Sequence, residues 1–264
     1  MNPRRSLRQA AALIAAIALV DASAAHAQSA EASIARVKES IVAVGTFERT
    51  RAPQFQFRGT GFAVGDGTLI ATNAHVLPPK LADAEQLAVL VPARGGEGTP
   101  AISMQVRVAR PAAVDAKHDI GVLKVDGPAL PALALGESAS VREGRSVYFT
   151  GFPIGTVLGF YPATHRAMVA AITPIAIPQA TSSQINAAVA KRLSQGAFPV
   201  FQLDGTAYPG NSGSPVYETG GETVIAVINM VLARATKESL LTQPSGIVYA
   251  IPVEHLRALL STVR

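Results

Sequence analysis

Short apolar segments recur along most of the chain, separated by turns that contain glycine, proline or aspartate. Many short strands at modest spacing favour a β-sandwich or β-barrels over alternating β-α-β units. The turn signal Gly65-Asp66-Gly67 between two of the segments indicates a hairpin. The pattern therefore predicts an all-β protein. The predicted strands are IVAVGTF, FQFRG, GTGFAV, GTLIAT, ISMQVRVA and IGVLKV in the first half, and RSVYFTG, RAMVAAI, FPVFQLD, ETVIAVINMVL and GIVYAI in the second.

The segment ISMQVRVA alternates strictly, with apolar residues at its even-numbered positions 102–108 and polar residues between them. Such alternation predicts a half-buried strand. The stretch DGPALPALALGES, at residues 126–138, is rich in proline and glycine and predicts a connector between two halves of the chain. We therefore expect two small β-barrels of similar size, over about residues 34–130 and about residues 140–252.

Three segments have helical spacing instead. EASIARVKESI (Glu31–Ile41) places Ile34, Val37 and its final isoleucine on one face. SSQINAAVAKRLS (Ser182–Ser194) and VEHLRALLSTV (Val253–Val263) are the other two predicted helices. The barrels are thus expected to carry a short N-terminal helix and a C-terminal helix.

The first residues have the pattern of a targeting segment. Three arginines within the first eight residues form a basic region, and the apolar run AALIAAIALV follows at residues 11–20. Ala25-His26-Ala27 then offers an A-x-A cleavage site. The apolar run is about half of the ~20 residues that a membrane span needs. We predict that residues 1–27 are a cleaved signal peptide, that residues 28–264 form the mature protein, and that the mature protein is not inserted in a membrane.

Composition excludes several classes of function. Hydrophobic residues make up 48% of the chain and charged residues 16%, which is typical of a chain with a large buried core. The absence of cysteine excludes disulfides, a thiol nucleophile and thiolate metal sites. Loss of residues 1–27 removes three arginines and one aspartate, which lowers the formal net charge from +5 to +3. This mild excess without a basic cluster predicts no nucleic-acid partner, and no histidine pair has the spacing of metal ligands.

Three residues together have the order of a catalytic triad. His75 follows a predicted strand in TLIATNAHVL, Asp119 precedes another in KHDIGVLKV, and Ser212 lies in YPGNSGSPV. Catalysis by a serine nucleophile needs a base, an acid that orients the base, and donors for the oxyanion. The order His, Asp, Ser is one of the known triad arrangements. Asp115 competes with Asp119 for the role of the acid.

The residues around Ser212 add to this interpretation. Gly210 lets the backbone approach a substrate, and its N–H can point at the same oxyanion as the N–H of Ser212. An α/β-hydrolase nucleophile elbow, G-x-S-x-G, is excluded because Ser214 occupies the last position. The chain after Ser212 also contains no aspartate, and its only histidine is His255 in the predicted terminal helix.

Five segments jointly resemble Deg/HtrA-type serine proteases of the trypsin-like superfamily, over about residues 34–260. The resemblance implies a trypsin-like fold of two six-stranded β-barrels with the active site between them, and no cofactor. It implies that His75 is the general base, Asp119 its orienting acid and Ser212 the nucleophile, with Gly210 and Ser212 forming the oxyanion hole. The segments are GTGFAVGDGTLIATNAHVL, HDIGVLKV, LPALALGESASVREGRSVYFTGFPIG, LDGTAYPGNSGSPV and GIVYAIP.

The same resemblance locates a substrate pocket. Its base is expected near Thr206 and Ala207, with a wall at Ile228–Met230 that includes Asn229. Glutamyl endopeptidases, which share the GNSGSP form, carry a histidine about where Asn229 falls, so a preference for glutamate is not expected. None of these residues is charged, which favours a small or medium apolar residue at the cleaved position.

Three further features distinguish this chain from many members of the family that it resembles. It ends just after the second predicted barrel, so we expect no peptide-binding PDZ module of the kind that many Deg proteins carry. The stretch at residues 179–196 is longer than usual and is open to interpretation as a lid, an oligomer contact or a surface insertion. Trypsin-like zymogens use an aspartate before the nucleophile to bind a new N-terminal ammonium. Asn211 carries no charge there, which predicts that such activation does not occur.

The sequence thus favours an exported serine endopeptidase, periplasmic or secreted, that forms an acyl-enzyme and acts on unfolded or damaged polypeptides. The alternative is a trypsin-fold protein that binds polypeptides like a chaperone with little or no turnover, because fold alone does not imply activity. The physiological substrate and a homo-oligomeric state are left open.

Overall fold

The computed structural model describes residues 30–92, 104–174, 198–230 and 246–263. The signal peptide predicted for residues 1–27 and the helix predicted for Ser182–Ser194 lie outside these ranges. No helix among the described residues is long and apolar enough to cross a membrane.

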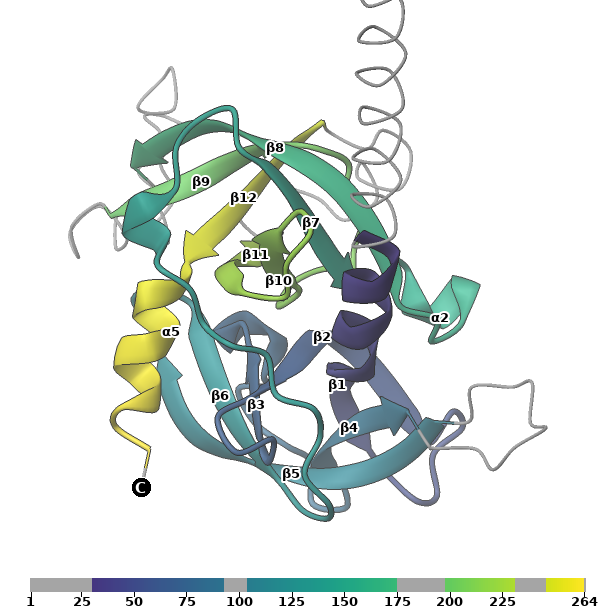
Figure 1. The fold of residues 1–264 in the computed structure, drawn as a ribbon. Coiled ribbons are helices and arrows are strands. Elements are labelled where there is room, and N and C mark those ends of the chain that lie inside the picture. Colours follow the sequence, from purple (N-terminus) through teal and green to yellow (C-terminus); the bar gives the residue numbers. More distant parts are fainter. Residues whose placement is uncertain (1–29, 93–103, 175–197, 231–245, 264) are drawn as a thin grey trace, which may run out of the picture.

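The first half of the chain forms a closed antiparallel barrel with the strand order β1-β2-β3-β6-β5-β4 (Figure 1). The two segments FQFRG and GTGFAV are one continuous strand, β2. The predicted hairpin joins β2 to β3, and Gly65 and Gly67 adopt the positive φ angles of 63° and 82° that its turn requires. The strands are β1 (Ile41–Phe47), β2 (Phe55–Val64), β3 (Leu69–Thr72), β4 (Gln86–Pro92), β5 (Met104–Asp115) and β6 (Ile120–Val125).

The second half forms another closed antiparallel barrel, with the order β10-β11-β12-β9-β8-β7. Its strands are also apolar runs that face the core, and β11 is buried at every position. The prediction of an all-β fold with two barrels is confirmed. The strands are β7 (Ser146–Gly151), β8 (Ala163–Pro174), β9 (Pro199–Asp204), β10 (Pro215–Glu218), β11 (Val224–Asn229) and β12 (Ile247–Pro252).

Helical elements are short. An N-terminal helix covers residues 30–39, and the predicted continuation to Ile41 is wrong because Ile41 begins β1. The C-terminal helix α5 (Val253–Leu260) confirms the predicted one. Between them lie η1 (Ala74–Val76), η2 (Ser138–Ser140) and α2 (Gly155–Leu158).

The strand β5 differs from its prediction. Val108 was expected on the buried face, yet it is 40% exposed, whereas the next residue, Ala109, is 6% exposed. The change occurs where β5 ends its pairing with β4 at Val108 and begins its pairing with β6 at Ala109. Met104 and Val106, on the face predicted to be buried, are half-buried and pack against the core, so the prediction is correct only as far as Val106.

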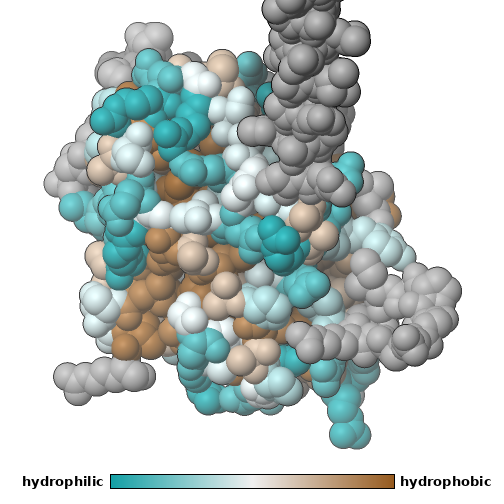
Figure 2. Space-filling view, viewed as in Figure 1, coloured by the Kyte–Doolittle hydropathy of each residue, from teal (hydrophilic) through white to brown (hydrophobic). Residues whose placement is uncertain are grey.

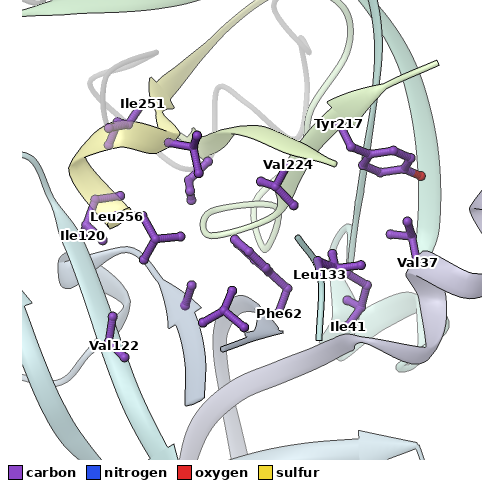
Figure 3. Packing of buried hydrophobic residues seen from close by; sticks show 14 of the residues in the cluster. Val37, Ile41, Phe62, Ile120, Val122, Leu133, Tyr217, Val224, Ile251 and Leu256 are labelled. Carbon is purple, nitrogen blue, oxygen red and sulfur yellow. The ribbon is translucent and has the colours of Figure 1, made fainter. Parts of the chain in front are cut away.

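One hydrophobic cluster joins the two barrels (Figure 3). Phe62 of the first barrel lies in it together with Tyr217 of the second, and both are fully buried. Leu256 of α5 packs in the same cluster as Ile120 of β6, so the helix that follows the second barrel covers the first. Figure 2 shows a hydrophobic area beside α5 on this face. Burial of these side chains fixes the barrels against each other, which matters because the candidate site is divided between them.

His165 of β8 faces the interior of the second barrel. It pairs across the strands with Phe149, and the two rings stack with centroids 4.9 Å apart. The buried Nε2 atom has no hydrogen-bond partner among the described residues, and burial lowers the pKa of the imidazole below its usual value. An unfolded chain therefore binds a proton at this residue at a pH where the folded protein does not.

This shift predicts acid sensitivity. Between about pH 7 and about pH 5, the free energy of unfolding should fall as protonation of His165 favours the unfolded chain. The His165→Phe variant keeps the stacked ring and should show a shallower decrease in denaturant melts across this range. Equal pH dependence of the two proteins would contradict the prediction.

Candidate active site

The first barrel brings His75 and Asp119 together. His75 lies in η1 directly after β3, and Asp119 directly precedes β6. The strands β3 and β6 are antiparallel neighbours in which Thr72 pairs with Gly121, so the end of one meets the start of the other. Asp119 Oδ2 lies 2.6 Å from His75 Nδ1, and the backbone N–H of His75 donates to Asp119 Oδ1 at 2.8 Å.

The second barrel contributes Ser212, from the loop between β9 and β10. Its Oγ lies 2.9 Å from Nε2 of His75, so one hydrogen-bonded chain runs from Asp119 through His75 to Ser212. Ser212 is 6% exposed, and the side chains of His75 and Asp119 are 27% and 18% exposed. The three side chains named from the sequence are therefore in contact.

Asp119 has a backbone conformation that few residues adopt. Its φ angle is 55°, in the left-handed region that aspartate tolerates better than most residues. Its carbonyl oxygen accepts hydrogen bonds from the N–H of Ala74 and from Nδ2 of Asn73, both at 3.1 Å. These bonds hold the backbone of Asp119 against the segment that carries His75, and so orient the carboxylate.

Asp115 has a different role. Its Oδ1 accepts the backbone N–H groups of Lys117 and His118, and its Oδ2 lies 2.5 Å from Nδ1 of His118. Burial opposes ionisation of Asp115, but the hydrogen bonds from His118 and Lys117 outweigh it and keep the pKa of this carboxyl below its usual value. Asp115 therefore closes the turn before β6 and makes no bond to His75.

The loop before Ser212 consists of tight turns. Gly210 and Gly213 have φ angles of 102° and 88°, in the region that favours glycine. The carbonyl oxygen of Pro209 accepts the N–H of Ile154 at 2.7 Å. In a trans peptide the N–H points away from the carbonyl, so the N–H of Gly210 points away from Ile154. Within the described ranges, the N–H groups of Gly210 and Ser212 have no acceptor.

A family model described as "Trypsin-like peptidase domain" matches residues 59–227, which is more than half of the chain. The chain belongs to this family. The matched range contains His75, Asp119 and Ser212.

Curated relatives of the chain are named as serine proteases. A protein of Halomonas elongata named "Probable periplasmic serine endoprotease DegP-like" is 28% identical over 197 residues, which cover 74% of this chain and 33% of the relative. "Putative serine protease HhoA" of Synechocystis is 29% identical over 212 residues, which cover 78% of this chain and 43% of the relative. The chain thus spans about a third to two fifths of the length of these relatives.

Solved structures agree on the fold. The active form of the Rv3671c protease from M. tuberculosis superimposes with a TM-score of 0.59 at 16% identity, over 88% of this chain and 83% of that one. The HtrA-type protease AlgW with a decapeptide gives a TM-score of 0.58 at 22% identity, over 87% and 66%. The resemblance to Deg/HtrA-type proteases predicted from the sequence is confirmed.

Asn229, which was predicted to line the substrate pocket, bonds to Asp119, and its contact with substrate stays a prediction. The residue is fully buried at the end of β11, and its Nδ2 donates to Asp119 Oδ2 at 2.7 Å. Its side chain therefore holds the carboxylate of Asp119 from the second barrel. No local sequence pattern predicts this bond, which joins residues from different barrels. The other two predicted pocket residues lie in the loop after β9, where Thr206 is half-buried and Ala207 packs in the core of the second barrel. Their contact with substrate stays a prediction.

No group of three or more histidine, aspartate or glutamate side chains in the described part of the chain is arranged to hold a metal ion.

Asn211, directly before Ser212, is fully buried and uncharged, and neither of its amide atoms has a partner among the described residues. An ion pair with an ammonium group is therefore unavailable at this position.

Gly210 has no room for a side chain. An added Cβ would lie 2.3 Å from the carbonyl oxygen of Phe152, at a φ angle that is strained for any L residue. We expect Gly210→Ala to displace the Gly210 N–H and to lower kcat by about 10²–10³, as loss of one oxyanion donor does. Steady-state hydrolysis of a peptide substrate measures this change.

Gly144→Ala is the matched control for Gly210→Ala. Gly144 has a comparable φ angle of 86°, but nothing lies within 4 Å of an added Cβ. Its alanine variant should lose stability by about 1–2 kcal/mol and keep its kcat. An equal loss of kcat in both variants would show that backbone strain alone, and not the oxyanion site, explains the effect.

Proposed function

We propose that the protein is a serine endopeptidase in which His75, Asp119 and Ser212 form the catalytic triad. The observation that carries this proposal is the continuous hydrogen-bonded chain from Asp119 Oδ2 through both ring nitrogens of His75 to Ser212 Oγ, with distances of 2.6 and 2.9 Å. Membership of the trypsin-like peptidase family supports it.

The geometry suits general-base catalysis. A carboxylate accepts hydrogen bonds only, so Asp119 holds the proton of neutral His75 on Nδ1 and leaves the lone pair of Nε2 directed at Ser212. As Oγ attacks the scissile carbonyl carbon, Nε2 takes the hydroxyl proton. The imidazolium then donates that proton to the leaving amine, which departs and leaves an acyl ester on Ser212. Water, activated by the same nitrogen, hydrolyses the ester.

We assign binding of the oxyanion to backbone N–H groups of the loop that contains Ser212. The N–H groups of Gly210 and Ser212 lack an acceptor among the described residues, which leaves both able to donate to a substrate oxygen. Such donors stabilise the negative charge that develops on the carbonyl oxygen in the transition state.

We infer that the protein acts outside the cytoplasm, in the periplasm or after secretion, on unfolded or damaged polypeptides. The signal-peptide pattern of residues 1–27 supports export. Several relatives are named as periplasmic serine endoproteases, which supports the same location.

Incubation of the purified mature protein with one polypeptide in its folded and in its permanently unfolded form tests this function. We expect new internal termini in the unfolded form, more slowly formed ones in the folded form, and none with Ser212→Ala. Stable complexes of the parent protein with the unfolded polypeptide, without any new terminus, would instead support the chaperone-like alternative.

A further inference from the structure

Thr60 contacts the nucleophile loop from the opposite barrel. It lies in β2, within the segment GTGFAV, and is fully buried. Its backbone N–H donates to the carbonyl oxygen of Ser212 at 2.8 Å, and its own carbonyl oxygen accepts the hydroxyl of Thr72 at 2.7 Å. The backbone of Thr60 is thus fixed on both sides, which gives its side chain a defined position.

The hydroxyl of Thr60 bridges two loops of the second barrel. The backbone N–H of Phe152 donates to Oγ1 at 3.0 Å, and Oγ1 lies 2.7 Å from the carbonyl oxygen of Gly210. The carbonyl of Gly210 is an acceptor only, so the hydroxyl proton of Thr60 must point to it. One buried hydroxyl therefore connects the segment after β7 to the loop that carries Ser212.

These bonds hold Gly210 on both sides. Ile154, two residues after Phe152, donates its N–H to the carbonyl of Pro209, and Thr60 donates its hydroxyl to the carbonyl of Gly210. The two carbonyls belong to the two peptide planes that flank the Cα atom of Gly210. Glycine has more accessible backbone conformations than any other residue, so external bonds must define its orientation.

We propose that Thr60 is a positioning residue for the oxyanion site. Its hydroxyl fixes the peptide plane after Gly210. Through the N–H of Phe152 it also holds the segment whose Ile154 binds the plane before Gly210, and this plane carries the N–H that is directed at the substrate. This inference rests on the proposed peptidase function. Thr60 touches neither substrate nor reacting atoms and acts through Gly210. Its effect is expected on the transition state, in which the oxyanion forms, and hardly on binding of the ground state.

Substitution by valine separates this role from simple packing. Valine keeps the shape of threonine but places a methyl group where Oγ1 lies, 2.7 Å from the carbonyl oxygen of Gly210. A carbon atom needs about 3.5 Å, so the Gly210 peptide must move. Thr60→Ser retains the hydroxyl. Thr60→Ala removes the hydroxyl without a clash, and it replaces Thr60→Val in the comparison if the valine variant does not fold.

The control is Thr46→Val. Thr46 lies in β1 of the same barrel, is 2% exposed, and bonds through its hydroxyl to Glu85, away from the nucleophile loop. We expect Thr60→Val and Thr60→Ala to lower kcat by about 10–10² with KM within about threefold, and Thr60→Ser and Thr46→Val to stay within about threefold of the parent. If Thr60→Val and Thr60→Ala retain the kcat of Thr46→Val, or if Thr60→Ser loses as much as they do, the proposal is overturned.

A second readout does not depend on peptidase activity. Amide hydrogen exchange should accelerate at Phe152 in Thr60→Val and Thr60→Ala, because the acceptor of this N–H is lost, and Thr60→Ser should restore slow exchange. Unchanged exchange at Phe152 would overturn the positioning role even in an inactive protein. Absence of hydrolysis by the parent protein, with accelerated exchange in the variants, would count against the proposed function and still support the bridge.

Discussion

Ser212→Ala is expected to lower kcat toward a polypeptide substrate by about 10⁶, because the acyl-enzyme can no longer form. The variant keeps the backbone of the loop, including the bond from the N–H of Thr60 to the carbonyl of residue 212. Its side chain loses only the contact with His75, so the fold and the melting temperature should change little. Steady-state kinetics at saturating substrate, together with a thermal melt, measure both effects.

Ser214→Ala provides the comparison in the same motif. Ser214 is fully buried, and its hydroxyl has no partner in the described part of the structure. Removal of this hydroxyl leaves no bonded group unsatisfied, so kcat should remain within about threefold of the parent value. If Ser212→Ala retained more than about a hundredth of the parent kcat, a second nucleophile would be required and the triad assignment would be wrong.

Asp119→Asn is expected to lower kcat by about 10⁴ without loss of fold. The carboxylate of Asp119 accepts three hydrogen bonds, from the backbone N–H of His75, from Nδ1 of His75 and from Nδ2 of Asn229. An amide offers one oxygen and presents N–H donors at the other position. If the amide NH₂ faces Nδ1, the proton of His75 moves to Nε2, which then cannot accept the proton of Ser212. Asparagine also tolerates the φ angle of 55°, so the backbone should stay in place.

Asp115→Asn tests whether this loss is specific to the residue that contacts His75. Asp115 precedes Asp119 by four residues and bonds to His118. Its replacement should weaken the turn and change kcat by less than about tenfold. Comparison of the kcat of the two variants at the same pH separates the roles, and a greater loss in Asp115→Asn would reverse the assignment of the acid.

The sequence predicted the two barrels because most of their strands contain short apolar segments that are separated by clear turns. The hairpin of β2 and β3 was predictable from Gly65-Asp66-Gly67, because glycine readily adopts the positive φ angles that this turn requires. The burial of Val108 was predicted wrongly: this residue holds the last position of β5 that pairs with β4, and it is exposed. Periodicity indicates which residues share a face and carries no information about how far along the strand the core extends.

The order His75, Asp119, Ser212 was readable from the motifs, because His75 and Asp119 flank predicted strands and Ser212 lies in the turn-rich motif YPGNSGSPV. The partners that support them were not readable in this way. Asn229 bonds to Asp119 across 110 residues of sequence, and Thr60 bonds to Gly210 across 150. Such contacts depend on how the barrels pack, which the shared hydrophobic cluster determines and which no local pattern records.

The most direct test of the triad is reaction of the mature protein with a fluorophosphonate, followed by mass spectrometry of the labelled peptide. This reagent phosphonylates a serine only where a neighbouring base and an oxyanion site activate it. We predict one adduct, on Ser212, in the parent protein and none in His75→Ala. An adduct on another residue, or no adduct on folded parent protein both alone and with unfolded polypeptide present, would contradict it.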